Sequence, residues 1–198
     1  MATYFIHQKI TPFANQYRIF DAQDSGPGKL RAFAHQKRLA LKEKFIFFTD
    51  ETKQTPAFQL QARKIIDLGA AYDVQDEQGE TIGILKKQFQ QSFFRSTWHL
   101  HTPGNEAVPF LIAQERSMPL AVLRRIWGFV PLFGEFPFFL KYHFDFIDPG
   151  THETVGEYNK IELIRDHYKL TVQDSYLKTC DWRTFVSLGV VMDALQSR

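Results

Sequence analysis

The 198-residue sequence has one cysteine, Cys180, which excludes an internal disulfide and any zinc site built from several cysteines. Its longest apolar stretches, 129–140 and 185–195, fall short of the roughly 20 residues needed to cross a bilayer. The N-terminus lacks a basic start followed by a long apolar run, so no secretory signal is expected. With 24 basic and 22 acidic residues there is no strong field of one sign, and no nucleic-acid partner is expected. We therefore expect a cytoplasmic protein whose membrane contact, where it occurs, is peripheral.

Enzyme signatures are also missing. The sequence contains no Gly-x-Ser-x-Gly elbow, P-loop, dinucleotide-binding glycine motif or His-Glu-x-x-His. We expect a non-enzymatic protein with no cofactor and no metal, although catalytic groups that only folding brings together would leave no such motif.

Hydrophobic residues make up 44% of the chain and aromatic residues 15%, with 20 phenylalanines. This composition excludes a disordered chain. Stiff aromatic side chains in such number favour strands around a wide core, within a single domain over residues 1–198.

Three segments repeat one pattern, in which an alternating strand is closed by an aspartate and followed by a glycine-containing turn and a second strand. The segments are Tyr17–Asp21 followed by Gly28, Tyr72–Asp76 followed by Gly79 and Gly83, and Phe144–Asp148 followed by Gly150 and Gly156. Aspartate bonds nearby backbone and glycine accepts positive φ, so each segment predicts a hairpin.

Alternation or apolar runs predict further strands within 45–48, 94–101, 109–112, 138–147 and 168–172. About four strands in each of three units gives roughly twelve. A meander of that length usually closes into an antiparallel β-barrel, because closure removes the exposed edges.

The C-terminal segment has a different pattern. Asp181 is suited to cap a helix over 182–195 that is apolar on nearly every side after its first turn. Its 14 residues span about 21 Å, which is too short for a bilayer but suits the axis of a wide barrel. We therefore predict a mainly β fold in which the barrel encloses a central hydrophobic helix.

Several of these motifs together resemble the LURP-one-related family, which is grouped with phospholipid scramblases and, by fold, with the tubby C-terminal domain. The similar stretches are Tyr72-Asp73-Val74 with Asp76, Gly79 and Gly83, Ser92-Phe93-Phe94-Arg95-Ser96-Thr97-Trp98, Gln36-Lys37-Arg38-Leu39-Ala40-Leu41 and Asp181-Trp182-Arg183. The resemblance covers about Tyr4 to Leu195 and implies a twelve-stranded, tubby-like barrel around a C-terminal helix. It also implies phosphoinositide headgroups as ligands for exterior basic side chains. Calcium binding like that of scramblases is not expected, because 165–174 lacks closely spaced oxygen donors.

Basic residues concentrate near the start of the chain. Residues 1–66 hold eleven basic and five acidic residues, a net charge of +6. The candidates for binding an anionic headgroup are Lys29, Arg31, Lys37, Arg38, Lys42 and Lys44. The alternative is a solvated strand face that keeps the barrel from aggregating.

An apolar insert near residues 118–137 is the second candidate. It has the composition of an amphipathic helix for a membrane interface or a partner groove, and the alternative is a segment that caps the barrel. The candidate contact residues are Arg124, Arg125, Trp127, Phe129 and Phe133.

Two smaller features have ordinary explanations. His99 and His101 have a spacing that can bind zinc, but spacing identifies no third ligand, so we expect an exterior surface pair. Cys180 precedes the last helix, where a thiolate can be reactive, but a small packing residue is the simpler interpretation.

Together these features favour a binding module that recognises anionic phospholipid headgroups at a membrane surface. A protein-interaction scaffold that uses the insert is one alternative, and a small-molecule carrier or enzyme at a barrel mouth is another. The sequence does not determine the oligomeric state.

Overall fold

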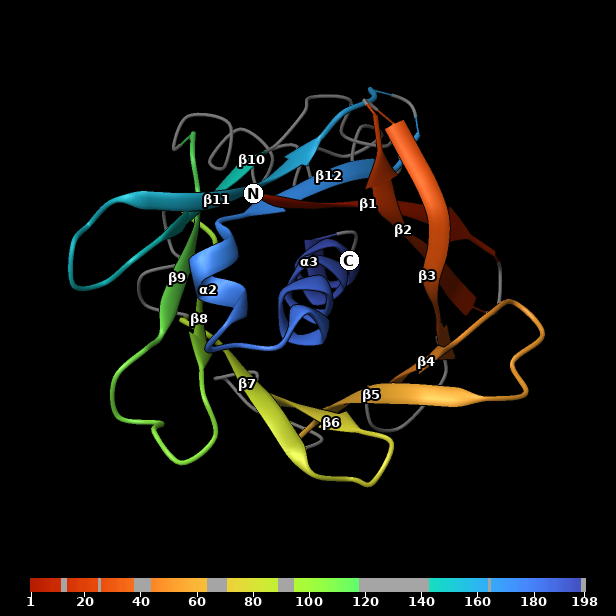
Figure 1. Cartoon of the computed structure of the whole chain (residues 1–198), viewed down its shortest axis with the longest axis horizontal. Helices are drawn as coiled ribbons and strands as arrows, with labels where there is room; N and C mark the ends of the chain where they lie inside the picture. The colour runs from red at the N-terminus through yellow and green to blue at the C-terminus, as the bar shows by residue number, and fades with distance from the viewer. Residues whose placement is uncertain are drawn as a thin grey trace, which may run out of the picture.

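The computed structural model describes residues 1–11, 14–24, 26–37, 44–63, 71–88, 95–117, 143–163 and 165–196. Within these ranges twelve strands form one closed barrel in which every strand pairs antiparallel with its neighbours in sequence (Figure 1). The strands are β1 (Ala2–Ile10), β2 (Ala14–Gln23), β3 (Gly26–Lys37), β4 (Lys44–Phe48), β5 (Pro56–Ala62), β6 (Ala71–Asp76), β7 (Thr81–Lys87), β8 (Thr97–His101), β9 (Leu111–Glu115), β10 (His143–Ile147), β11 (Thr154–Lys160) and β12 (His167–Val172). The predicted β-barrel is confirmed.

The first and last strands close the barrel. β1 pairs with β2 on one side and with β12 on the other, from Ala2 opposite Val172 to His7 opposite His167. A strand alternates its side chains between two faces, so this register turns Tyr4 and Ile6 into the barrel and His7 outward. Closure therefore places residues from the two ends of the sequence on one outer wall.

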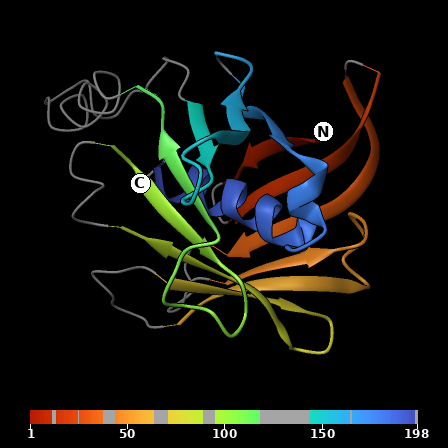
Figure 2. The ribbon, with the colours of Figure 1, turned by 60° about the vertical axis from the view of Figure 1, so that its left-hand side comes forward.

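Two helices follow β12. The short α2 (Asp174–Leu177) leads into α3 (Trp182–Gln196), which runs through the centre of the barrel (Figures 1 and 2). Asp181 caps α3 as predicted, because its Oδ1 accepts the Arg183 backbone N–H at 2.8 Å. No helix in the described ranges is long and apolar enough to cross a bilayer.

The lumen is filled by contacts between α3 and the inward faces of the strands. Phe185, Val186, Leu188, Val190 and Val191 on α3 have no exposed surface. The inward strand residues around them include large aromatic side chains, namely Tyr17, Phe45, Phe47, Trp98, Phe144, Phe146, Tyr158 and Tyr168. A barrel this wide leaves a lumen that its own side chains do not fill, so the helix completes the core.

The three predicted hairpins form, but only two of the predicted aspartates make their turns. Asp76 Oδ1 accepts the backbone N–H groups of Gln78 and Glu80 at 3.0 and 2.9 Å, and Asp148 Oδ1 accepts comparable bonds in its own turn. The expected closing role of Asp21 is wrong, because β2 continues to Gln23 and Asp24 adopts the positive φ of 51° at the turn. A β-bulge between β2 and β3 shifts the register in this region and moves the turn beyond Asp21.

Gly83 allows α3 to approach β7 closely. A Cβ at position 83 would lie 2.4 Å from Cγ2 and 2.5 Å from Oγ1 of Thr184 in the first turn of α3. The sequence placed Gly83 among the turn glycines, but its side of the strand faces the helix.

Gly83→Ala should therefore destabilise the protein by about 1–3 kcal/mol, the usual cost of overpacking a filled core. Urea unfolding followed by circular dichroism measures this loss. Gly26→Ala is the matched control, because a Cβ at position 26 meets no atom within 4 Å, and it should change stability by less than about 0.5 kcal/mol. Equal effects of the two substitutions would contradict the packing argument.

A carboxylate is buried near the end of α3. Asp193 is 2% exposed and accepts hydrogen bonds from the Tyr17 hydroxyl at 3.0 Å and from the Tyr168 hydroxyl. Burying a carboxylate is costly unless hydrogen bonds replace its water, so these two inward tyrosines hold α3 against β2 and β12.

Tyr168→Phe removes one of these donors and should cost about 1–3 kcal/mol of unfolding free energy. The comparison is Tyr4→Phe, an inward tyrosine of similar burial for which the described residues provide no hydrogen-bond partner to the hydroxyl. Thermal and urea unfolding of both variants measure the difference, and a Tyr4→Phe loss as large as that of Tyr168→Phe would refute this role of the carboxylate.

Candidate functional site

Three strands place basic and imidazole side chains in a row on the outer wall of the barrel. His7 on β1 lies directly opposite Arg18 on β2 and directly opposite His167 on β12. Neighbouring strands lie about 4.8 Å apart, so the three side chains share one small area of the surface. Lys9, two residues along β1, extends the row on the same face.

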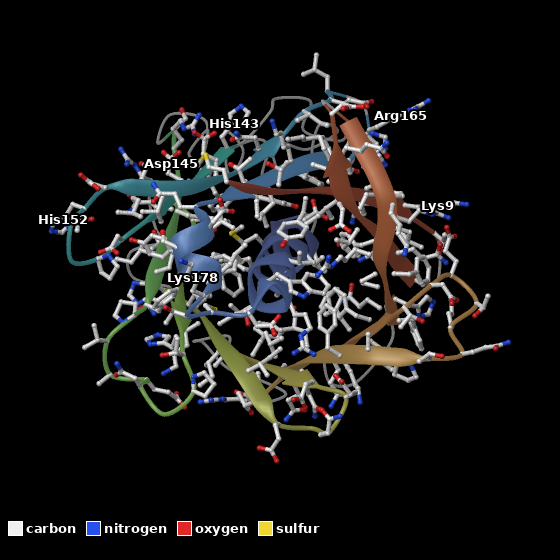
Figure 3. The ribbon with its side chains drawn as sticks, viewed as in Figure 1. Lys9, His143, Asp145, His152, Arg165 and Lys178 are labelled. Carbon is white, nitrogen blue, oxygen red and sulfur yellow. The ribbon has the colours of Figure 1, made fainter. Side chains whose placement is uncertain are left out.

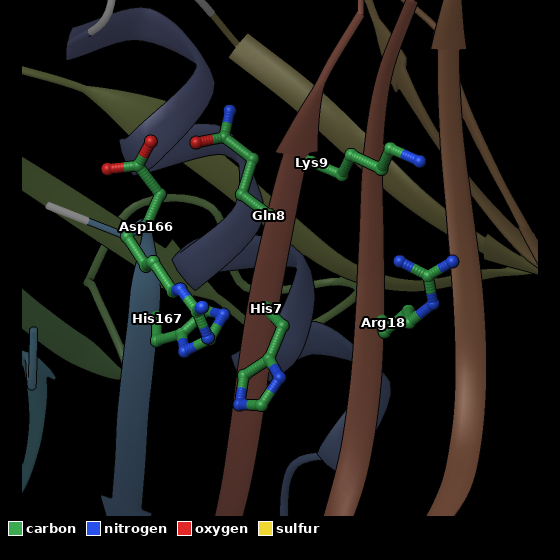
Figure 4. A pocket seen from close by; sticks show the side chains of 7 residues that line it. His7, Gln8, Lys9, Arg18, Asp166 and His167 are labelled. Atoms are coloured by element: carbon green, nitrogen blue, oxygen red, sulfur yellow. The ribbon is translucent and has the colours of Figure 1, made fainter.

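A pocket of about 400 Å³ opens over this row (Figure 4). Figure 4 shows the rings of His7 and His167 side by side, while Lys9 extends from β1 across β2 and Arg18 extends from β2 toward β3. The backbone N–H of Gln8 donates to the Asp166 carbonyl at 2.8 Å, which joins the segment before β12 to β1. The lining residues are His7, Gln8, Lys9, Arg18, Arg165, Asp166 and His167.

The two imidazoles form the floor of the pocket. The rings of His7 and His167 are stacked, with centroids 3.8 Å apart and planes 14° from parallel, and His7 also contacts the Phe20 ring at 5.1 Å. Nδ1 of His167 lies 2.8 Å from Oε1 of Glu162. Burial lowers the pKa of His7, and the neighbouring His167 and Arg18 lower it further.

The acidic groups around the pocket already have partners. Arg18 makes two hydrogen bonds to Glu51 at 2.8 and 2.6 Å, and Lys160 holds Asp166 at 2.7 Å. Within the described ranges no salt bridge engages Lys9 or Arg165, and both side chains are exposed. Two cations therefore remain available to an incoming anion.

This arrangement is suited to binding. Ammonium, guanidinium and imidazole N–H groups are the donors that phosphate and sulfate oxygens accept, and here three strands contribute them to the lining of one pocket. In the part of the chain that the structure describes, no group of three or more histidine, cysteine or acidic residues could hold a metal ion.

The predicted headgroup residues lie elsewhere, on β3 and β4. Lys29 is exposed near the start of β3, where Arg31 lies 3.4 Å from Asp21 and 4.5 Å above the Trp182 ring. Lys44 begins β4 at the other end, about 25 Å along the strand direction from Lys29. Lys37 is the last residue of β3, and its side chain, like Arg38 and Lys42, lies outside the described residues.

The second predicted surface lies outside the described residues altogether. None of its candidates, Arg124, Arg125, Trp127, Phe129 and Phe133, is in a described range. The hypothesis of a protein contact through 118–137 stays a prediction.

His99 and His101 lie on the outer face of β8 as expected, but His99 is half-buried and His101 is buried. His101 is 3% exposed, and its Nδ1 lies 3.2 Å from the Val108 carbonyl oxygen. The connection between β8 and β9 covers this face, a packing that strand alternation alone does not reveal. Burial likewise raises the pKa of Cys180 to about 12, which keeps it a thiol and favours a packing role.

A comparison with known protein families matches residues 30–193 to LURP-one-related. The match covers most of the sequence. The chain belongs to the LURP-one-related family. A search of curated proteins finds no match.

Sequence reasoning missed the pocket of this LURP-one-related chain because its residues come from the two ends of the chain. In the sequence, the stretch from Arg165 bears only on calcium binding, and Lys9 and Arg18 stand out only as part of the basic excess of residues 1–66. Figure 3 shows Lys9 and Arg165 on the same side of the barrel, far from His152. The available signal was the alternation that turns His7 and Lys9 outward on β1, combined with the expectation that the barrel closes.

The positive charge of Arg18 should be measurable through His7. Arg18→Gln removes a cation that disfavours the protonated imidazole and also frees Glu51, so the pKa of His7 should rise. A pH titration of the imidazole resonances by NMR measures the change. His152, exposed on another side of the barrel, serves as the internal control, and an unchanged or lower His7 pKa would contradict the electrostatic account.

Proposed function

We propose that this protein is a non-enzymatic module that binds anionic phospholipid headgroups, phosphoinositides in particular, at the cytoplasmic surface of a membrane. The observation that carries the proposal is the pocket in which Lys9 and Arg165 lack salt bridges within the described ranges and lie beside two imidazoles. Its location on the outer wall lets a headgroup enter while the rest of the lipid stays in the bilayer.

The packed lumen favours an exterior ligand. Side chains of α3 and the strands occupy the centre of the barrel, and the inward residues have almost no exposed surface. A carrier or enzyme that enclosed its substrate in the barrel would need that space.

An exposed leucine beside the pocket also supports a membrane ligand. Leu163 is 53% exposed in the connection between β11 and β12, two residues before Arg165. An apolar side chain next to cations is the combination that meets a bilayer interface, where the cation approaches phosphate and the leucine enters the headgroup region. Each basic residue near an anionic membrane contributes about 1 kcal/mol to binding.

Co-sedimentation with vesicles tests the proposal. Vesicles of phosphatidylcholine containing a phosphoinositide should retain the protein at low salt, and pure phosphatidylcholine vesicles should not. Lys9→Gln with Arg165→Gln removes two cations and should weaken binding about thirtyfold. Negligible and equal binding to both vesicle types would refute the proposal.

The matched control removes the same charge elsewhere. Lys29→Gln with Lys44→Gln neutralises two exposed lysines of the β3–β4 region and should leave binding within about threefold of the original, an effect of long-range charge alone. If this control loses binding and the pocket variant keeps it, the headgroup site is on β3 and β4 as the sequence predicts, and the pocket is not the site.

A further inference from the structure

The pocket contains two ionisable groups in direct contact, an arrangement that hydrogen bonding between strands does not require. His7 and His167 are cross-strand partners whose rings stack at 3.8 Å. Two neutral imidazoles pack well in this geometry, but two protonated ones would repel each other across that distance.

We propose that the pocket is a proton-linked phosphate site, in which the His7–His167 pair takes up a proton as a phosphate group binds. This inference rests on the proposed function for its biological ligand, and it adds the chemical group recognised and the control of its affinity by pH.

The charges around the pair explain the linkage. On one side, β1 contributes Lys9, and β2 contributes Arg18 together with its partner Glu51. On the other side, β12 and the segment before it contribute charged groups, namely Glu162, Arg165, Asp166 with its partner Lys160, and Lys169. Glu162 lies 2.8 Å from His167 and also raises the pKa of His7, but burial, His167 and Arg18 together outweigh it. Without an anion in the pocket, burial, His167 and Arg18 oppose a proton on His7 and hold its pKa below 6.5.

A bound phosphate reverses that balance. Its negative charge lies between the cations and the rings, so it stabilises an added proton and raises the pKa of the pair. Because the bound state then holds more protons than the free state, affinity must rise as the pH falls. The gain in phosphate affinity is complete at a pH below the pKa that the imidazoles have without phosphate. It disappears as the pH rises through their pKa with phosphate bound.

The shape of the pocket favours a terminal phosphate group. Lys9 lines it from β1 and Arg165 from the segment before β12, so a group with several exposed oxygens can meet more than one donor at once. A lipid headgroup and a soluble phosphate ester both present this group, and the experiment separates the two sources.

Sulfate is the informative probe. A phosphate ester changes its own charge near pH 6, whereas sulfate stays doubly negative over the range in which histidine titrates. Sulfate affinity, measured by NMR titration between about pH 5.5 and about pH 7.5, should rise about tenfold for each pKa unit by which sulfate raises the titration of the pair. Saturating sulfate should shift the titration of His7 upward, and calorimetry in buffers of different ionisation enthalpy should show proton uptake.

His7→Gln with His167→Gln keeps polar side chains at both positions and should make sulfate affinity nearly independent of pH. His152→Asn is the control: it replaces an exposed histidine at positive φ, which asparagine also accepts, and should leave the pH dependence unchanged. The titration of the unmodified protein tests the proposal even if the double variant is unstable. If sulfate fails to raise the imidazole pKa, or its affinity does not change with pH, the proton linkage is wrong.

These outcomes are distinct from those of the vesicle experiment. Proton-linked sulfate binding without vesicle binding would support the inference and assign the site to a soluble phosphate. Vesicle binding with no effect of pH on sulfate affinity would keep the proposed function and overturn the inference. Inositol phosphate that competes for the vesicle-bound protein, more strongly at low pH, would support both.

Discussion

Burial of α3 is the interaction on which the barrel depends. A ring of twelve strands encloses more space than its own side chains fill, and an unfilled apolar lumen would lose packing energy along every strand. Residues such as Phe185, Leu188 and Val191 are fully buried, and each such side chain contributes about 1.5–3 kcal/mol. Gly83, the cap at Asp181 and the two tyrosines that bind Asp193 are adaptations of the wall to the helix inside it.

The packing of the core also determines which residues face outward on the barrel wall. Because every strand must turn its large apolar residues inward, its alternate residues are free to be polar, and neighbouring strands align them in rows. Elsewhere on the wall some rows of cations are neutralised: Arg116 pairs with Asp145 and Glu157, and Arg63 pairs with Asp73 and Glu106. Where β12 meets β1, the basic side chains outnumber the carboxylates that pair with them. This local excess of positive charge, and not the total charge of the protein, defines the pocket.

Much of the fold could be predicted from the sequence because its signals are local. Alternation identified strands such as 168–172, Asp76 and Asp148 identified their turns, and the apolar run after Asp181 identified the central helix. The failures came from contacts between distant segments. A bulge moved the turn expected at Asp21, the connection after β8 covered His101, and the pocket required the exact register of β1 against β12. Charge counted along the chain favours the basic residues of β3 and β4, among them Lys29 and Arg31, and that surface stays a prediction. The charge of a surface after folding also depends on which carboxylates lie nearby.

The pairing of β1 with β12 also has a consequence for synthesis. A chain that emerges from the ribosome N-terminus first holds β1 without its second neighbour until β12 has been made, more than 150 residues later. The α3 segment is made later still, so the barrel cannot be both closed and filled until α3 has been made. His7 and His167 therefore meet only after β12 has been made, and chains that stop before β12 lack the pocket at this seam.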